Sequence, residues 1–135
     1  SKMADYFENL GACVPDNLIA GNNIPIMTAS GIIRAGQNAL KRGTVLAIST
    51  GSTGDGKLVI LGTAATPDTE ALTAYAILAD DVDATSEAVA EVYVSGQFNK
   101  NALIVGSDYT LKTEDIVALR NGGIFIENAI GEKEE

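Results

Sequence analysis

Apolar and polar positions divide the chain into an irregular first third and a regular remainder. Through the first 42 residues, glycine, proline and asparagine recur so often that no period of 3.6 or 2 residues is sustained. Short apolar pieces such as Leu18-Ile19 and Ile24-Pro25-Ile26-Met27 lie between these interruptions. We therefore expect residues 1–34 to form an extended or flexible N-terminal arm that docks on a partner. A disordered leader without a role is the alternative.

From Gly43 onward the pattern is typical of β-strands. Short runs rich in β-branched and other apolar residues are bounded by turn-forming residues. Residues 50–56 predict a glycine-rich turn that joins the first two runs as a hairpin, whereas residues 63–73 carry both helix and turn signals. The runs that predict strands are 43–49, 57–61, 74–79, 89–95, 102–105 and 124–126.

One segment near the C-terminus predicts a helix of about eight residues. Thr113 is a natural N-cap, and Glu114 and Asp115 place carboxylates in the first turn, where the helix dipole favours them. Leu119 follows at helical spacing. The Asn-Gly-Gly sequence at 121–123 ends the helix in residues that tolerate a left-handed backbone.

The length of the chain fits one domain with its own core. It has 135 residues, of which 46% are hydrophobic, and a domain typically takes about 100–200 residues. The predicted elements indicate a mainly β fold, a β-rich α+β single domain over residues 35–130 with one or two short helices. We expect residues 131–135 to form an acidic disordered tail.

The composition excludes most enzyme chemistry. There is no histidine and one cysteine, Cys13, so a Ser–His–Asp triad, an imidazole metal site, an internal disulfide and a multi-cysteine metal site are all ruled out. We predict no catalytic residues, no cofactor and no metal. The 18 acidic residues against 9 basic ones give a net charge of −9, which disfavours nucleic acid and anionic membranes as partners. No apolar run is long enough to span a membrane.

Two local motifs resemble a phosphate-binding loop and a calcium-binding loop, but other positions of each motif do not match. Residues 51–57 fit the first seven positions of a phosphate-binding loop, yet Leu58 stands where a hydroxyl would hold magnesium, and a strand pattern follows. Residues 80–83 hold three carboxylates, but the sixth and twelfth positions counted from Asp81 lack the glycine and glutamate of an EF-hand. We predict a hairpin turn and an exposed acidic turn, respectively.

Four segments carry a more specific signal because they occur in a fixed order. They are AGQNALKRGTVL at 35–46, AILADDVDAT at 76–85, VYVSGQFN at 92–99 and ALRNGGIF at 118–125. In this order the chain resembles the phage head-decoration protein family typified by lambda, from about Ala35 to Phe125. The positions that carry the resemblance are Gly36, Gly43, Ile77, Leu78, Asp81, Asp83, Gly96, Phe98, Asn99, Leu119, Arg120, Gly123, Ile124 and Phe125.

The resemblance implies a small β-barrel or β-tulip-like protomer that forms a homotrimer. It further implies a cement protein that binds the major capsid protein at three-fold sites on the outer surface of the expanded icosahedral head and stabilises it. Such a protein is not an enzyme and takes no cofactor. A single thiol is compatible with synthesis in the reducing host cytoplasm.

The first third of the chain is the predicted capsid contact, because its apolar and β-tolerant residues can pair with the edge of a partner's sheet. Deleting residues 3–33 is predicted to leave trimers intact and to abolish decoration. The alternative is a β-rich module that recognises glycans or a host surface, which would need exposed aromatic residues that the 5% aromatic content does not readily supply. The predicted contact residues are Ile24, Pro25, Ile26, Met27, Thr28, Ala29 and Ser30.

Overall fold

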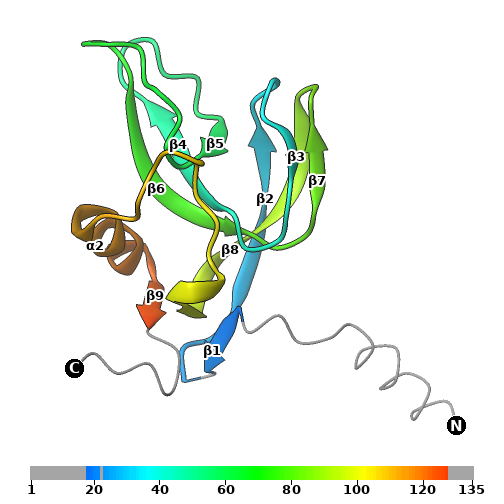
Figure 1. The fold of residues 1–135 in the computed structure, drawn as a ribbon, viewed down its shortest axis with the longest axis vertical. Helices are drawn as coiled ribbons and strands as arrows, with labels where there is room; N and C mark the ends of the chain where they lie inside the picture. Colours follow the sequence, from blue (N-terminus) through cyan, green and yellow to red (C-terminus); the bar gives the residue numbers. More distant parts are fainter. Residues whose placement is uncertain (1–17, 22, 128–135) are drawn as a thin grey trace, which may run out of the picture.

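The computed structural model describes residues 18–21 and 23–127, which form a small β-barrel with one α-helix (Figure 1). Strands hold 47% of these residues and helices 12%, so the predicted β-rich fold class is confirmed. The strands are β1 (Ile19–Gly21), β2 (Met27–Ile33), β3 (Asn38–Leu40), β4 (Val45–Thr50), β5 (Leu58–Ile60), β6 (Ala71–Leu78), β7 (Val82–Ala84), β8 (Ala88–Asn99) and β9 (Ile124–Glu127). The helices are a 3-10 turn, η1 (Lys100–Ala102), and α2 (Thr113–Gly122).

The longest strand, β8, organises the sheet. The strand order is β1-β8-β2-β5-β4-β6, and β6 closes the barrel by pairing Ile77 with Tyr93 and Leu78 with Val92 of β8. The C-terminal half of β8 also pairs with β1 on one side and with β9 on the other. β3 and β7 form a separate two-stranded ribbon beside β2 (Figure 1).

Two apolar clusters lie on opposite faces of β4. Val45 and Ala47 belong to the cluster that packs under α2, while Leu46 belongs to the cluster that includes Ile33 of β2. A strand that is buried on both faces has a continuous apolar sequence. This explains why the run at 43–49 was readable as a strand.

Most of the other predicted strands are present in the structure, and two of the predicted segments differ from it. β4 and β5 form the predicted antiparallel hairpin, and β6, β8 and β9 overlap their predicted runs. The run at 102–105 is wrong as a strand, because Ala102 belongs to the η1 turn and the rest of the run makes a single bridge, Thr44 to Ile104. The acidic turn predicted at 80–83 is wrong in its second half, since Val82 starts β7.

The helix α2 lies where the sequence predicts it, with its cap displaced by one residue. The N-cap is Lys112, and the Asp115 carboxylate accepts hydrogen bonds from the Lys112 backbone N–H at 2.9 Å and from the Tyr109 hydroxyl at 2.5 Å. At the other end, Gly123 takes a left-handed backbone with a φ of 111° and closes the helix.

Part of the predicted arm belongs to the sheet. β2 pairs with β8 from Met27–Ser95 to Ile33–Ala88, and β1 pairs with its C-terminal end. Leu18 and Ile33 are 1% and 0% exposed. The expected division at residue 34 is therefore corrected: the described residues before it include two strands of the domain. Residues 1–17 and the predicted tail at 131–135 lie outside the described residues.

Neither helix in the described part of the chain is long and apolar enough to cross a membrane.

Candidate docking site at the N-terminal end of the sheet

The N-terminal segment and the last strand meet on β8 at the lower end of the barrel (Figure 1). Gly21 lies opposite Gln97, and Met27 lies opposite Ser95. On the other side of the same stretch, Gln97 is in register with Phe125 of β9. The residues predicted to contact a capsid therefore lie where β1, β2 and β9 pair with β8.

Two side chains of β8 fasten the segment that leads into β2. The Gln97 Oε1 atom accepts a hydrogen bond from the Asn23 backbone N–H at 2.9 Å, and its Nε2 donates to Glu127 Oε2 at 2.6 Å. The Ser95 hydroxyl donates to the carbonyl oxygen of Pro25 at 2.6 Å. The residues immediately before β2 are thus held by side chains rather than by a strand ladder.

Large apolar side chains are exposed directly after this fastening. Ile26 is 43% exposed and Met27 is 58% exposed. Gly96 lets Ile26 approach β8, because a Cβ on Gly96 would lie 3.0 Å from the Phe98 ring and 3.4 Å from Ile26 Cγ1. Its φ of 140° also favours glycine. The site therefore presents apolar surface on a well-supported backbone.

The strand that follows, β2, has a partly open edge. In the part of the chain that the structure describes, pairing between β2 and β5 is confined to Ile33 with Leu58, followed by the Arg34 N–H donating to the Leu58 carbonyl. Because backbone groups alternate in direction along a strand, those of Thr28 and Ser30 point to the same side as Arg34 and lie before the part of β2 that pairs with β5. An extended partner segment can pair with this edge.

The seven predicted contact residues gather in this one stretch. Ile24 is half-buried, and the other six are exposed. Gln97 and Ser95 were not among the predicted contact residues, although they hydrogen-bond to this segment from 70 or more positions away in the sequence. Nothing in the strand pattern around these two residues distinguishes them from ordinary strand residues.

The family-signature positions do not gather at this site but are spread through the core and the turns. Ile77, Leu78, Phe98, Leu119 and Ile124 are each at most 1% exposed. The signature glycines all have positive φ, and they are Gly36, Gly43, Gly96 and Gly123. These residues shape the domain.

The remaining signature residues mostly organise local structure. Asp81 accepts a hydrogen bond from the Arg42 backbone N–H at 2.7 Å. The Thr85 hydroxyl and N–H both donate to Asp83, which lowers the pKa of that carboxyl. The Asn99 N–H donates to the Leu18 carbonyl at 2.8 Å. Arg120 is exposed in the last turn of α2, and Phe125 is half-buried in β9.

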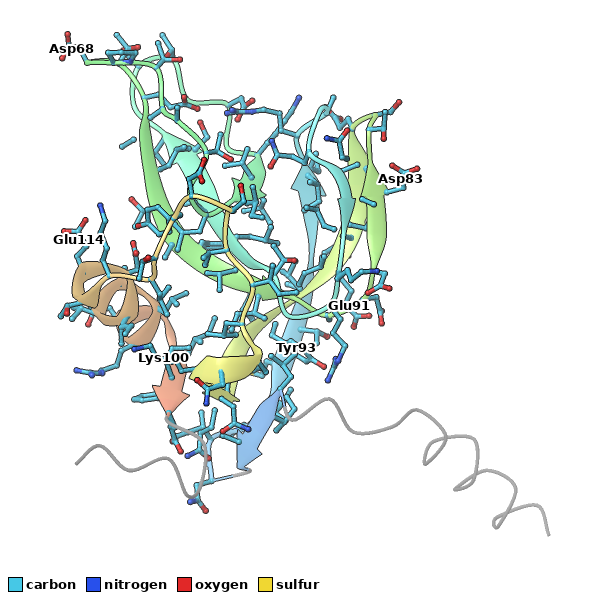
Figure 2. All side chains as sticks on the ribbon, viewed as in Figure 1. Asp68, Asp83, Glu91, Tyr93, Lys100 and Glu114 are labelled. Carbon is cyan, nitrogen blue, oxygen red and sulfur yellow. The ribbon has the colours of Figure 1, made fainter. Side chains whose placement is uncertain are left out.

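The acidic residues that the structure describes do not form a cation site. Asp68, Asp83, Glu91 and Glu114 lie at separate places on the surface (Figure 2). Among residues 18–21 and 23–127, no group of three or more histidine, cysteine, aspartate or glutamate side chains is placed to hold a metal.

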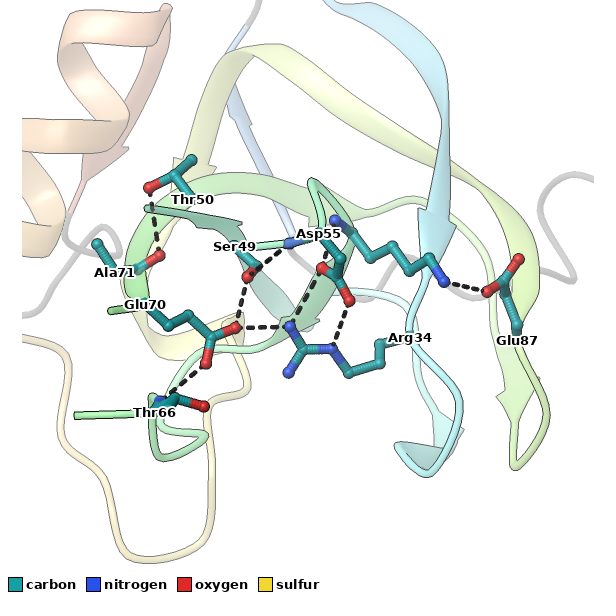
Figure 3. Close-up of polar contacts among 9 residues, drawn as sticks. Arg34, Ser49, Thr50, Asp55, Thr66, Glu70, Ala71 and Glu87 are labelled. Atoms are coloured by element: carbon teal, nitrogen blue, oxygen red, sulfur yellow. Dashed lines mark hydrogen bonds and ion pairs between the residues drawn. The ribbon is translucent and has the colours of Figure 1, made fainter. Parts of the chain in front are cut away.

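The far end of the barrel carries a polar cluster that explains the glycine-rich loop (Figure 3). The Glu70 carboxylate accepts hydrogen bonds from Ser49 Oγ at 2.5 Å, Arg34 at 2.7 Å and the Thr66 N–H at 2.9 Å. Arg34 also pairs with Asp55 at 3.1 Å. The Glu70 side chain is 4% exposed and that of Arg34 is 28% exposed.

The apparent phosphate-binding motif is part of this arrangement. Residues 51–57 connect β4 to β5, as predicted for a hairpin turn, and the Lys57 ammonium pairs with Glu87 at 2.5 Å. Both features are those of a structural loop.

Acid should weaken the fold through Glu70. The hydrogen bonds from Ser49, Arg34 and Thr66 lower its pKa from 4.5 to about 2. A lowered carboxyl pKa stabilises the folded state above the unfolded pKa, and this contribution is lost as the pH falls from about 5 to about 2. The Tm of the wild type is therefore expected to fall more steeply across this window than that of Glu70→Gln. Parallel curves of Tm against pH would contradict this role for Glu70.

Comparison with known proteins agrees with the sequence signature. Among curated proteins, none shows significant similarity to this chain. The family model of bacteriophage lambda head decoration protein D matches residues 9–124, which is most of the chain. This match includes the signature residues of the core and the predicted contact residues 24–30, and it ends at the first residue of β9. The chain therefore belongs to the bacteriophage lambda head decoration protein D family.

Proposed function

We propose that this protein is a capsid cement that binds the major capsid protein as a homotrimer at three-fold sites on the outer surface of the expanded phage head. The observation that carries the proposal is the exposed apolar segment at an open strand edge in a member of a head decoration family. A protein that binds the assembled shell and not its dissociated subunits stabilises the shell by mass action. The protein would be made in the host cytoplasm and would act without enzymatic chemistry or a cofactor.

The capsid contact is assigned to residues 24–30. Ile26 and Met27 supply apolar surface, and the open edge beyond them supplies unpaired backbone groups. Pro25 has no N–H, so at that position the segment offers a carbonyl alone, and this already accepts from Ser95. A capsid strand would therefore pair from Thr28 onward.

The subunit contact is assigned to the other end of β2. Ile32 and Val89 lie directly opposite each other on β2 and β8, and they are 44% and 70% exposed. A cross-strand apolar pair with this exposure is a natural surface for a second protomer to cover. Because this pair and Met27 are at opposite ends of β2, trimer formation and capsid binding need not compete. Light scattering of a trimer should give three times the 14.0 kDa protomer mass.

The direct test is to mix the purified protein with expanded, undecorated capsids and to image the particles. Density at the three-fold positions, together with a higher temperature of capsid disruption, is the expected result. Bound density elsewhere, or no bound density at saturating protein, would refute the proposal. Capsids that have not expanded serve as the comparison for the requirement for expansion.

The role of the apolar segment can be tested by Met27→Asp. Burial of a methionine side chain contributes about 1.5–3 kcal/mol, so we expect decoration to weaken by about tenfold or more per protomer. Half-saturation of capsids measures this effect. Val117→Asp is the matched control, because Val117 is 40% exposed on α2, away from the docking site. Equal losses in both variants would contradict the assignment.

Recognition of glycans or a host surface is the competing function. Its structural support in the described residues is one aromatic, Tyr75, among the exposed large apolar side chains. Binding of the protein to a glycan array, with no binding to capsids, would favour this function over the cement role.

A further inference from the structure

We propose that Gln97 is the positioning residue of the docking segment, and that it couples capsid binding to the pairing of the C-terminal strand β9. This inference rests on the proposed capsid contact at residues 24–30. Its basis is that one side-chain amide bridges the N-terminal segment at Asn23 and the last strand at Glu127, across the strand that lies between them.

The chemistry of the two partners fixes how this amide is oriented. Glu127 Oε2 accepts a hydrogen bond, so it requires the NH₂ group of Gln97 as its donor. The amide oxygen then faces the Asn23 N–H, which can only donate. Each hydrogen bond therefore holds the amide in the orientation in which the other bond can form. Loss of one bond weakens the other.

The neighbouring strand β1 leaves space for the Gln97 amide at Gly21. Gly21 lies opposite Gln97 on β1, and a Cβ added to Gly21 would lie 3.0 Å from Gln97 Oε1. A side chain at position 21 would therefore press against the amide oxygen that holds Asn23. The absence of a Cβ at this position is part of the same arrangement.

The segment between the two fastenings is short and leads directly to the apolar contact. Gln97 holds Asn23, and Ser95 holds the Pro25 carbonyl. Ile26 and Met27 follow immediately. A segment that is already ordered loses less conformational entropy on binding, so its affinity is higher.

The size of the effect follows from the number of arms. A hydrogen bond of this kind contributes about 1 kcal/mol, which corresponds to about fivefold in affinity for one protomer. If three arms of a trimer engage together, the loss multiplies to about a hundredfold. Such a shift is large enough to measure as half-saturation of capsids.

The bond to Glu127 extends the effect to the C-terminal strand. β9 runs parallel to β8, with Asn99 opposite Glu127 at its last paired position. If ordering of Asn23 favours the Gln97 orientation that also binds Glu127, capsid binding must strengthen the pairing of β9. Hydrogen exchange of the 124–127 amides should therefore slow when the protein is bound to capsids.

The experiment compares three variants with the wild type in capsid titrations. Gln97→Met keeps the length of the side chain and removes both hydrogen bonds, so it should weaken decoration about fivefold per protomer. Gln97→Glu still accepts from Asn23 but repels Glu127, and it should also weaken decoration. The double variant Gln97→Glu/Glu127→Gln restores both bonds with one donor reversed, and it should return half-saturation to within about threefold of the wild type.

Gln37→Met is the matched control. Gln37 Oε1 also accepts a backbone hydrogen bond, from Ile60 at 2.8 Å, but it lies away from the docking segment. It should lower the Tm by an amount similar to Gln97→Met without changing half-saturation. A second readout, hydrogen exchange of the Asn23 amide in the free protein, should accelerate in Gln97→Met alone.

The outcomes separate the two proposals. No decoration by the wild type overturns the proposed function and this inference with it. Decoration by the wild type with unchanged half-saturation in Gln97→Met overturns the positioning role alone. Failure of the double variant to rescue Gln97→Glu overturns the coupling to β9.

Discussion

A chain that begins at Arg34 is expected to remain unfolded, although the sequence pattern starts the domain at residue 35. Such a chain lacks all seven residues of β2, which pair with β8 along most of their length. It also lacks Leu18 and Ile33, which are 1% and 0% exposed. Loss of a buried leucine or isoleucine side chain costs about 2–5 kcal/mol. Two such losses together with a missing strand approach the whole stability of a small domain, about 5–15 kcal/mol.

The matched control is a chain that begins at Leu18, which keeps every strand that the structure describes. It should show the far-ultraviolet circular dichroism of the full chain and a cooperative thermal transition. The chain from Arg34 should show neither. A cooperative transition near the wild-type Tm in the chain from Arg34 would mean that the domain folds without β2. Deletion of residues 3–33 is therefore unsuitable as a test of capsid binding, because it would remove a structural strand together with the contact.

Replacement of Phe98 by alanine is expected to lower the free energy of unfolding by about 3–5 kcal/mol. Phe98 is fully buried, and the centroid of its ring lies 5.3 Å from the ring centroid of Tyr93. The ring also fills the space above Gly96, where no side chain is present. The residues around it come from several elements, so they cannot collapse into the cavity without moving β8.

Urea denaturation at a fixed protomer concentration measures this change, since the stability of an oligomer depends on concentration. Phe98→Leu retains most of the volume and should lose about 1.5 kcal/mol. Phe125→Ala is the comparison for aromatic loss at a half-buried site, where a smaller decrease is expected. Equal decreases in Phe98→Ala and Phe125→Ala would show that burial at position 98 is not what stabilises the fold.

An element can be predicted from the sequence when the residues that specify it are close together in the chain. β4 and the helix α2 could be recognised because their signals lie within a few neighbouring residues: apolar positions on both faces for β4, and carboxylates followed by glycine for α2. β2 could not, since Thr28, Ala29 and Ser30 are exposed and give the strand no apolar alternation. Its strand conformation comes from pairing with β8, more than 50 positions along the chain.

The candidate site divides in the same way. The apolar and β-tolerant character of residues 24–30 predicts them as a contact, and in the structure six of these seven residues are exposed. The bond between Gln97 and Asn23 joins residues 74 positions apart, so no local pattern contains it. Side-chain contacts of this kind depend on which strands become neighbours.

The amino-acid sequence by itself determined the absence of histidine and cysteine-pair chemistry, the acidic charge, the β-rich class and the signature of the family. These properties depend on composition and on short-range pattern. The tertiary structure alone decided that Ile19–Gly21 and Met27–Ile33 belong to the sheet, and that Ile26 and Met27 are exposed next to Gly96 and Ser95 of β8. The physical reason is that strand pairing is non-local: β8 fixes the neighbours on both of its sides, and only this pairing creates the partly open edge of β2 and the candidate docking site.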